Sequence, residues 1–262
     1  MACLACIGRL GRAGIHPSLM SILSRIPLRA SFLLRLAGCP AASISDIISP
    51  LIAEQRRFMP KPTKADTLLN TAYAELGLSG ATAADKYAAI ASIISSLSAV
   101  HSATPITQGT TGAISERLCA LALEQIRSDH PTFAHRPFGR NWKWIGDILI
   151  SADPYDLAVS VKSYKAKERL LASGTGSLLT PTIGWGLFND VREWSEARTA
   201  SYLYRGFIAI YMPSDILAGV GDSAKAITNI NGNPLLRDLL KFPGDIAAAI
   251  KNRNGRVDCR KL

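Results

Sequence analysis

The stretch WIGDILISADPYDLAVSVKS, residues 144–163, decides the fold class of this chain. It contains two short apolar runs, 144–151 and 155–163, which are rich in Ile, Leu and Val and are separated by a turn-forming segment at 152–154. Runs of this length and composition are typical of β-strands. The stretch therefore predicts two strands joined as a hairpin or tight strand pair.

The second run alternates in a period of two, so Ser160 and Lys162 project from the same face of its strand. If the turn is centred between Pro154 and Tyr155, Asp147 lies directly opposite Lys162. Directly opposed residues share a face and have Cβ atoms about 5 Å apart. A carboxylate and an ammonium would then meet at the open end of the two strands. Such a pair can hold a divalent cation through the carboxylate while the lysine faces a scissile phosphate or the attacking water.

The regions on either side of the strand pair differ in their patterns. Upstream we expect helices at 67–76 and 83–100, a loop at 104–112, and an amphipathic helix that carries Glu116 in its first turn and ends at Pro131. Downstream we expect a loop at 173–182, an aromatic turn at 183–188, a short helix at 191–199, a strand at 202–212 and then mostly helices. This order predicts one α/β domain with a helical N-terminal addition.

The composition excludes several classes of protein. With 262 residues, of which 48% are hydrophobic, the chain can bury a core without disulfides or structural zinc. Its five cysteines are an odd number, and the one CxxC motif, Cys3 to Cys6, has no second motif to pair with. This favours a reducing, cytoplasmic environment. Arginines 25, 29 and 35 interrupt the most apolar N-terminal stretch, so we expect no transmembrane span and no membrane partner.

The basic charge is concentrated at the N-terminus. The net charge is +10, and residues 1–45 hold five arginines and no acid. Such a segment has three readings that the sequence leaves open: an organellar transit peptide, a non-native upstream extension, or a basic arm that contacts phosphates. We therefore divide the chain into a basic extension at 1–42, a helical subdomain at 43–104, and a core with C-terminal helices at 105–262.

The residues around the strand pair resemble a known family. Gly146-Asp147-Ile148 followed by Ser160-Val161-Lys162 resembles the active site of PD-(D/E)xK nucleases, and the run from Ser160 to Gly176 is similar to type II restriction endonucleases in particular. Gly112-Ala-Ile-Ser-Glu116-Arg resembles the Gly-xxx-Glu-Arg start of the first core helix in resolvase-like members, which use the acid as an extra metal ligand. The resemblance covers about residues 105–215.

The sequence departs from the family pattern in two places. Gly146 stands where the family has proline, which has no chemical role, and Ser160 replaces the second acid. Related enzymes with Ser-x-Lys are thought to take the missing carboxylate from a helix. The candidates for that carboxylate are Glu116, which is favoured by its motif, and Glu124 and Glu168.

The resemblance implies a restriction-endonuclease-like core, a central mixed sheet flanked by helices, and a homodimer that cleaves double-stranded DNA with Mg²⁺. The catalytic residues that it implies are Asp147, Ser160, Lys162 and Glu116, of which Asp147 and Glu116 hold the metal. The DNA-binding residues that we expect are Lys165, Lys167, Arg169 and Ser173. The three cations are equally explained as a solvated helix face.

Other functions remain open at this point. The chain could be a non-catalytic nucleic-acid-binding protein on a decayed nuclease fold, or a repair or resolvase nuclease, which would be organellar if 1–42 is a transit peptide. The Gly- and Ser-rich run at 173–177 lacks the spacing of a phosphate-binding loop, so we expect no nucleotide cofactor. Trp142 and Trp144, with basic neighbours, are expected to be packed tryptophans beside snorkelling cations, with DNA contact as the alternative.

Overall fold

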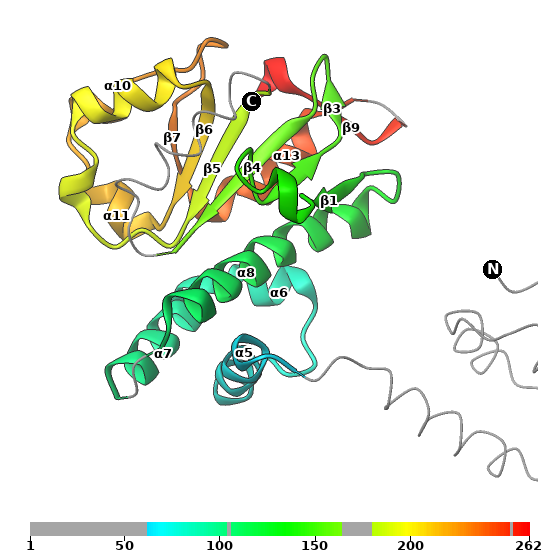
Figure 1. Cartoon of the computed structure of the whole chain (residues 1–262), viewed down its shortest axis with the longest axis vertical. Helices are drawn as coiled ribbons and strands as arrows, with labels where there is room; N and C mark the ends of the chain where they lie inside the picture. The colour runs from blue at the N-terminus through cyan, green and yellow to red at the C-terminus, as the bar shows by residue number, and fades with distance from the viewer. Residues whose placement is uncertain (1–61, 104–105, 164–179, 252–253) are drawn as a thin grey trace, which may run out of the picture. The chain divides into compact units, whose positions relative to one another are not determined.

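The computed structural model describes residues 62–103, 106–163, 180–251 and 254–262. These residues belong to one compact unit, 62–262, in which helices flank a central sheet (Figure 1). Within the described ranges, no helix combines the length and apolar composition that a bilayer-spanning helix requires.

Four helices precede the sheet in the described part of the chain: α5 (Lys64–Glu75), α6 (Ala83–Ala88), α7 (Ile90–Ala103) and α8 (Gln108–Asp129). Thr63 caps α5 and Thr82 caps α6, each in a capping box with an aspartate three residues later. The expected helix at 67–76 is confirmed, with its start moved to this cap. The expected helix at 83–100 is divided, because α6 ends at Ala88 and the backbone leaves helical geometry at its C-cap, Ala89.

The central sheet has six strands in the order β1-β2-β4-β5-β6-β7. Their bounds are His135–Pro137, Ile148–Ile150, Leu157–Lys162, Thr182–Gly186, Phe207–Met212 and Leu236–Asp238. β1, β2 and β4 pair antiparallel, whereas β4, β5, β6 and β7 pair parallel. The prediction of an α/β fold with a mixed central sheet flanked by helices is confirmed.

The remaining described elements connect or cover the sheet. A small second sheet joins β3 (Ala152–Asp153), β9 (Arg256–Asp258) and β8 (Ile250–Lys251). The later helices are α10 (Glu196–Tyr204), α11 (Ser214–Gly219), α12 (Asp222–Lys225) and α13 (Phe242–Ala249). Short 3-10 turns are η1 (Arg140–Trp142), η3 (Val191–Glu193), η4 (Leu239–Lys241) and η6 (Cys259–Lys261).

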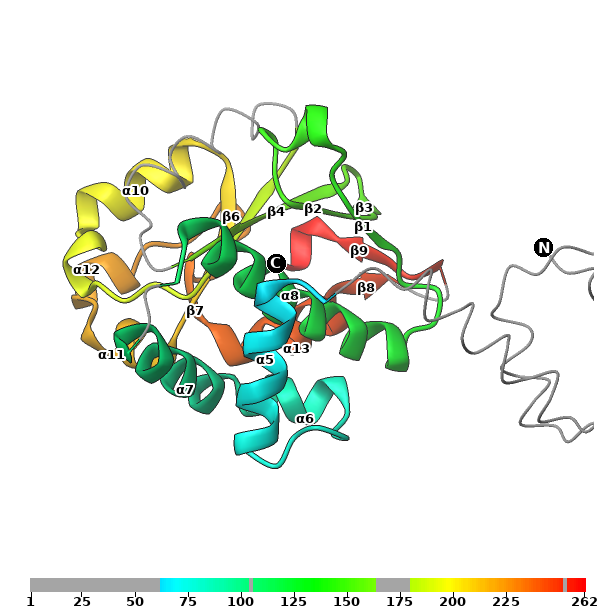
Figure 2. The same ribbon diagram turned by 60° about the horizontal axis from the view of Figure 1, so that its bottom comes forward.

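Two hydrophobic cores cover the two faces of the sheet. On one face Leu157, Val159 and Val161 of β4 pack in a core with side chains of α5 to α8 and α13. On the other face Phe207, Ile210 and Met212 of β6 pack in a core with α10, α11 and α12. Figure 2 shows α5, α7, α8 and α13 together on one side of the strands. The period of two in β4 thus assigns Val159 and Val161 to the α8 side, and Ser160 and Lys162 to the other side.

The prediction of a turn at 183–188 was wrong, because Thr182–Gly186 forms β5, a fully buried strand at the centre of the sheet. Two glycines hide this strand in the sequence, since glycine weakens a strand pattern. The structure explains their presence. A Cβ on Gly186 would overlap the Phe188 ring, and one on Gly184 would lie 3.3 Å from Ile210. Close packing against Phe188 therefore requires glycine at position 186.

Strands were also missed at the C-terminus. The expectation that this part is mostly helical was incomplete, because β7, β8 and β9 lie among its helices. Each of these strands has two or three residues, which is too short for a period of two to be recognised. Their strand character comes from pairing with partners distant in the sequence, such as β6 for β7 and β3 for β9.

Candidate active site

Asp147 and Lys162 meet where β4 ends and β2 begins. Lys162 is the last residue of β4, and Asp147 immediately precedes β2, which runs antiparallel to β4. The Nζ atom of Lys162 lies 3.5 Å from Oδ2 of Asp147, and the side chains are only 14% and 15% exposed. This is the carboxyl edge of the parallel strands, the edge at which open α/β sheets bind ligands.

The predicted register of the strand pair was wrong by two residues. The structure places Ile148 opposite Val159, whereas the prediction requires Val161 there. The connection between the strands is not a tight turn, because β3 lies within it and pairs with β9. A shift of two residues leaves every side chain on its own face. For this reason Asp147 and Lys162 still meet, although they are not directly opposed.

Hydrogen bonds fix the orientation of the Asp147 carboxylate. The backbone N–H of Asp147 donates to the carbonyl of Val159 over 2.8 Å, and Oδ2 of Asp147 accepts the N–H of Val161 over 2.7 Å. Phe138 N–H donates to the Asp147 carbonyl over 3.0 Å. Within the described part of the chain, Oδ1 accepts no hydrogen bond, so this oxygen is left to bind a cation.

Ser160 lies between the two β4 residues that bind Asp147, but it has no exposed surface. In the parallel pairing of β4 with β5, it stands beside Gly184. Its hydroxyl is therefore shut off from solvent in this conformation. The position that carries an acid in the family pattern is here part of the interior of the sheet.

Glu116 is not in the first turn of its helix, which corrects the prediction. Thr107 caps α8, so that the helix begins at Gln108 and Glu116 is its ninth residue. The stabilisation of a carboxylate by a helix N-terminus falls off within the first turn and does not act on Glu116. The predicted loop at 104–112 is wrong from residue 108 onward, because Thr107 caps the helix there.

Glu116 instead forms an ion pair with Lys143, which lies four residues before Asp147. Its Oε1 is 3.1 Å from Lys143 Nζ, and both side chains are about half exposed. Burial raises the pKa of the Cys119 thiol, and the negative charges of Asp147 and Glu116 raise it further. Both carboxylates therefore act on one buried sulfur of α8. However, α8 packs against the face of β4 opposite to Lys162.

The other candidate acids are distributed differently. Burial raises the pKa of Tyr73, and the charge of Glu124 adds to this effect, which puts Glu124 near α5. Glu168 and the expected DNA-binding residues Lys165, Lys167, Arg169 and Ser173 lie outside the described residues. Among the residues that the structure describes, no three side chains of His, Cys, Asp or Glu gather closely enough to hold a metal ion.

No family model, curated protein or solved structure matches this chain.

The tryptophans upstream of Asp147 are not packed, contrary to the expectation. Trp142 and Trp144 are 56% and 51% exposed, and their ring centroids lie 6.4 Å apart. Trp185 and Trp194, the other two tryptophans of the chain, are 0% and 2% exposed. The alternation of Trp142, Lys143 and Trp144 around a turn could have indicated exposure, since neither ring lies in a periodic apolar run.

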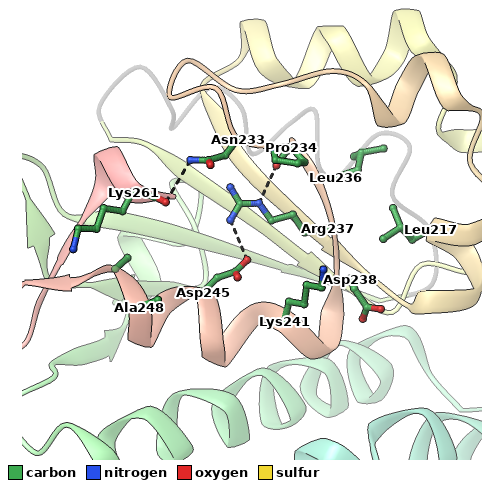
Figure 3. Close-up of a pocket in the computed structure, with 11 residues that line it drawn as sticks. Leu217, Asn233, Pro234, Leu236, Arg237, Asp238, Lys241, Asp245, Ala248 and Lys261 are labelled. Atoms are coloured by element: carbon green, nitrogen blue, oxygen red, sulfur yellow. Dashed lines mark hydrogen bonds and ion pairs between the residues drawn. The ribbon is translucent and has the colours of Figure 1, made fainter.

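A hollow of about 380 Å³ lies away from these residues, beside the edge strand β7 (Figure 3). Arg237 lines it and is held by Asp245 at 3.0 Å and by the carbonyl of Pro234 at 2.9 Å. Tyr211 donates to the same Asp245 carboxylate over 2.8 Å. Because Arg237 and Asp245 are paired with each other, their charges mainly compensate within the wall of the hollow. None of the predicted site residues lines it.

Proposed function

We propose that this chain is a Mg²⁺-dependent endonuclease of the type II restriction class that cleaves double-stranded DNA. The observation that carries the proposal is the mostly buried pair of Asp147 and Lys162, 3.5 Å apart at the carboxyl edge of the parallel strands. The resemblance to PD-(D/E)xK nucleases assigns chemistry to these same two residues. A restriction-endonuclease-like core is the finer fold that we propose within the observed mixed sheet.

Asp147 is suited to be a metal ligand. Mg²⁺ in nucleotide chemistry is typically held by one or two carboxylates, by water and by substrate phosphates. Asp147 offers Oδ1, while the Val161 N–H and Lys162 Nζ hold its Oδ2. Glu116 is the proposed second ligand, and it must leave Lys143 to take that role. When bound, Mg²⁺ supplies positive charge to the phosphate oxygens and lowers the pKa of bound water.

Lys162 is suited to bind the scissile phosphate. Its Nζ also lies 3.2 Å from the Val161 carbonyl, so the end of the side chain is fixed at the strand terminus. In the proposed reaction water attacks phosphorus, one phosphorus–oxygen bond to deoxyribose breaks, and the leaving oxygen takes up a proton. The Lys162 ammonium counters the negative charge that develops on the phosphate oxygens.

The net charge of +10 supports a polyanionic substrate. We further propose that the chain acts as a homodimer, because a two-fold protein matches a palindromic site with one active site per strand. Sedimentation velocity of the purified chain tests this proposal. A single monomeric species at micromolar concentration, with and without DNA, would contradict it.

One observation favours a second function. The residue in place of the second acid, Ser160, is fully buried and supplies no ligand to an open site. This is what a non-catalytic nucleic-acid-binding protein on a decayed nuclease fold would show.

A plasmid cleavage assay separates the two functions. Purified wild-type chain is incubated with supercoiled plasmid and Mg²⁺, beside Asp147→Ala, Lys162→Ala and the control Asp222→Ala, which removes an exposed acid of α12. The nuclease proposal expects discrete fragments from wild type and control, and none from the two site variants. Cleavage by Asp147→Ala within about tenfold of wild type, a barrier change of only about 1.4 kcal/mol, would show that the site is elsewhere. Binding without any cleavage would favour the second function.

A further inference from the structure

We infer that Trp142 and Trp144 form a stacking surface for unpaired nucleobases of DNA beside the candidate active site. The inference rests on the proposed function and specifies its substrate. It implies that nucleotides near the scissile phosphate are unpaired or extruded when DNA is bound. The inference is based on the placement of an exposed aromatic pair close to the Asp147 carboxylate, on one short loop that is closed by backbone hydrogen bonds.

The exposure of the pair is selective. This chain buries Trp185 and Trp194 almost completely but leaves Trp142 and Trp144 more than half exposed and adjacent to each other. Aromatic side chains are among the largest contributors to a hydrophobic core when they are buried. A fold that leaves two of them in solvent, side by side, presents a surface that an aromatic partner can cover.

The loop that carries the pair is held in shape by its own backbone. The Trp142 N–H donates to the Gly139 carbonyl over 2.8 Å, and the Ile145 N–H donates to the Trp142 carbonyl over 3.0 Å. The Ile145 side chain is buried. The Phe138 N–H bond to Asp147 closes the loop at its base. Lys143, between the two tryptophans, is tied to Glu116 of α8. The rings are therefore presented from an ordered turn, which lowers the entropy lost when a ligand stacks on them.

The loop lies within reach of the nucleotides around a phosphate held at Asp147. Trp144 is three residues from Asp147, and three residues span at most about 11 Å. Successive nucleotides of one DNA strand rise about 3.4 Å, so this reach covers about three nucleotides. A base near the scissile phosphate can thus meet the rings without displacing that phosphate.

The charges of the loop fit the same occupant. Residues 136–147 contain three basic residues, Arg136, Arg140 and Lys143, and one acid, Asp147; Glu116 of α8 offsets the charge of Lys143. Basic residues interleaved with aromatic ones are the combination with which proteins bind single strands: cations contact the phosphates and rings stack on the bases. In a paired duplex the base faces are covered by their neighbours. The tryptophan faces therefore favour nucleotides that are unpaired.

Binding is tested without cleavage, in EDTA, so that the result does not depend on nuclease activity. The full chain is titrated with a fluorescent thymidine oligonucleotide of about 12 nucleotides, and with a hairpin duplex as comparison. We expect tryptophan fluorescence to be quenched by the single strand. We expect Trp142→Ala/Trp144→Ala to weaken its binding by about 5- to 150-fold, and Trp142→Phe/Trp144→Phe to retain most of it.

Tyr204→Ala is the matched control, because Tyr204 is an exposed aromatic residue of α10, outside the loop. It should bind the oligonucleotide as wild type does. Equal affinity of wild type and the double alanine variant, with both folded by circular dichroism, overturns the inference. Resistance of the tryptophan pair to quenching by acrylamide in the free protein also overturns it, since a second copy of the chain then covers the rings.

The two proposals fail in different ways. Plasmid cleavage with no effect of the tryptophan substitutions on binding leaves the nuclease and rejects the stacking surface. Binding that depends on the tryptophans, with no cleavage by wild type under any Mg²⁺ concentration, rejects the nuclease and retains a nucleic-acid-binding surface.

Discussion

The ammonium of Lys162 lies 3.5 Å from Oδ2 of Asp147, although the two residues are not opposite each other in the pairing of β2 with β4. The contact is diagonal, and the length of the lysine side chain bridges it. The same carboxylate oxygen accepts the Val161 N–H over 2.7 Å. One oxygen of Asp147 is thus fully engaged by β4, which leaves the other as the chemically available one.

The first prediction concerns the stability of this pair. Asp147→Asn and Lys162→Met should each lower the free energy of unfolding by about 1–3 kcal/mol, because each removes the ion pair while the other charge stays poorly solvated. The double variant should lose less than the sum of the two. Urea unfolding of the four proteins measures the coupling. The half-exposed pair Glu116 and Lys143 serves as control, with an expected coupling of at most about 1 kcal/mol. Additive losses at Asp147 and Lys162 would contradict the interaction.

The second prediction concerns the missing carboxylate. If Glu116 supplies it, Glu116→Gln should raise the Mg²⁺ concentration needed for half-maximal cleavage. Lys143→Met should lower that concentration, because it frees Glu116 from its ion pair. Mg²⁺ titrations of both variants, with Glu124→Gln and Glu168→Gln alongside, measure this. If Glu116→Gln behaves as wild type and Glu168→Gln fails, the assignment of Glu116 is wrong while the nuclease proposal stands.

The third prediction concerns the tight packing of β5. Gly186→Ala should destabilise the protein by about 1–3 kcal/mol, because the new Cβ would overlap the Phe188 ring. Gly244→Ala is a control for which we expect the opposite change in stability. Gly244 lies in α13, and a Cβ there meets nothing within 4 Å, so the substitution should stabilise the protein by up to about 1 kcal/mol. Thermal melts of both variants decide the matter, and equal shifts in one direction would refute the packing argument.

The fourth prediction concerns a buried hydroxyl that links three elements. Tyr87 of α6 donates to the Leu239 carbonyl over 2.7 Å and accepts from Trp185 Nε1 over 3.2 Å. Tyr87→Phe leaves both partners buried and unpaired, which should cost about 1–3 kcal/mol. Tyr73→Phe, at another buried tyrosine of the same core, should cost clearly less. The comparison requires only urea unfolding, and a Tyr73 effect as large as that of Tyr87 would show that the hydroxyl bonds are unimportant.

The fifth prediction concerns pH. Burial lowers the pKa of His135, and the positive charge of Arg127 adds to this effect. The unfolded chain therefore takes up a proton at His135 before the folded chain does. Stability from this residue is complete above its unfolded pKa of about 6.5 and declines as the pH falls below it. Unfolding free energies measured from pH 7.5 down to 5 should fall less steeply in His135→Gln than in wild type. His130→Gln is the control, and an identical slope in all three proteins would exclude His135 as the cause.

The strand pair and the contact between Asp147 and Lys162 followed from local information. The period of two around Ser160 and Lys162, the apolar run before it, and the turn residues between them specify an antiparallel pair and the face of each side chain. Because a shift of two residues preserves the face, the meeting of Asp147 with Lys162 survived an error in the register. The mixed α/β class also followed from the order of patterned segments.

Features that depend on distant partners were decided only by the tertiary structure. The connection between β2 and β4 contains β3, which pairs with β9 about a hundred residues away, so it is not the tight turn that the predicted register assumed. The buried strand β5 was missed because its glycines weaken the strand pattern. These glycines make room for Phe188 and Ile210, which pack against them. The exposure of Trp142 and Trp144 depends on the closure of their loop at Asp147. A sequence expresses local preference directly, but register, close approach and exposure arise from contacts between segments that local preference does not connect.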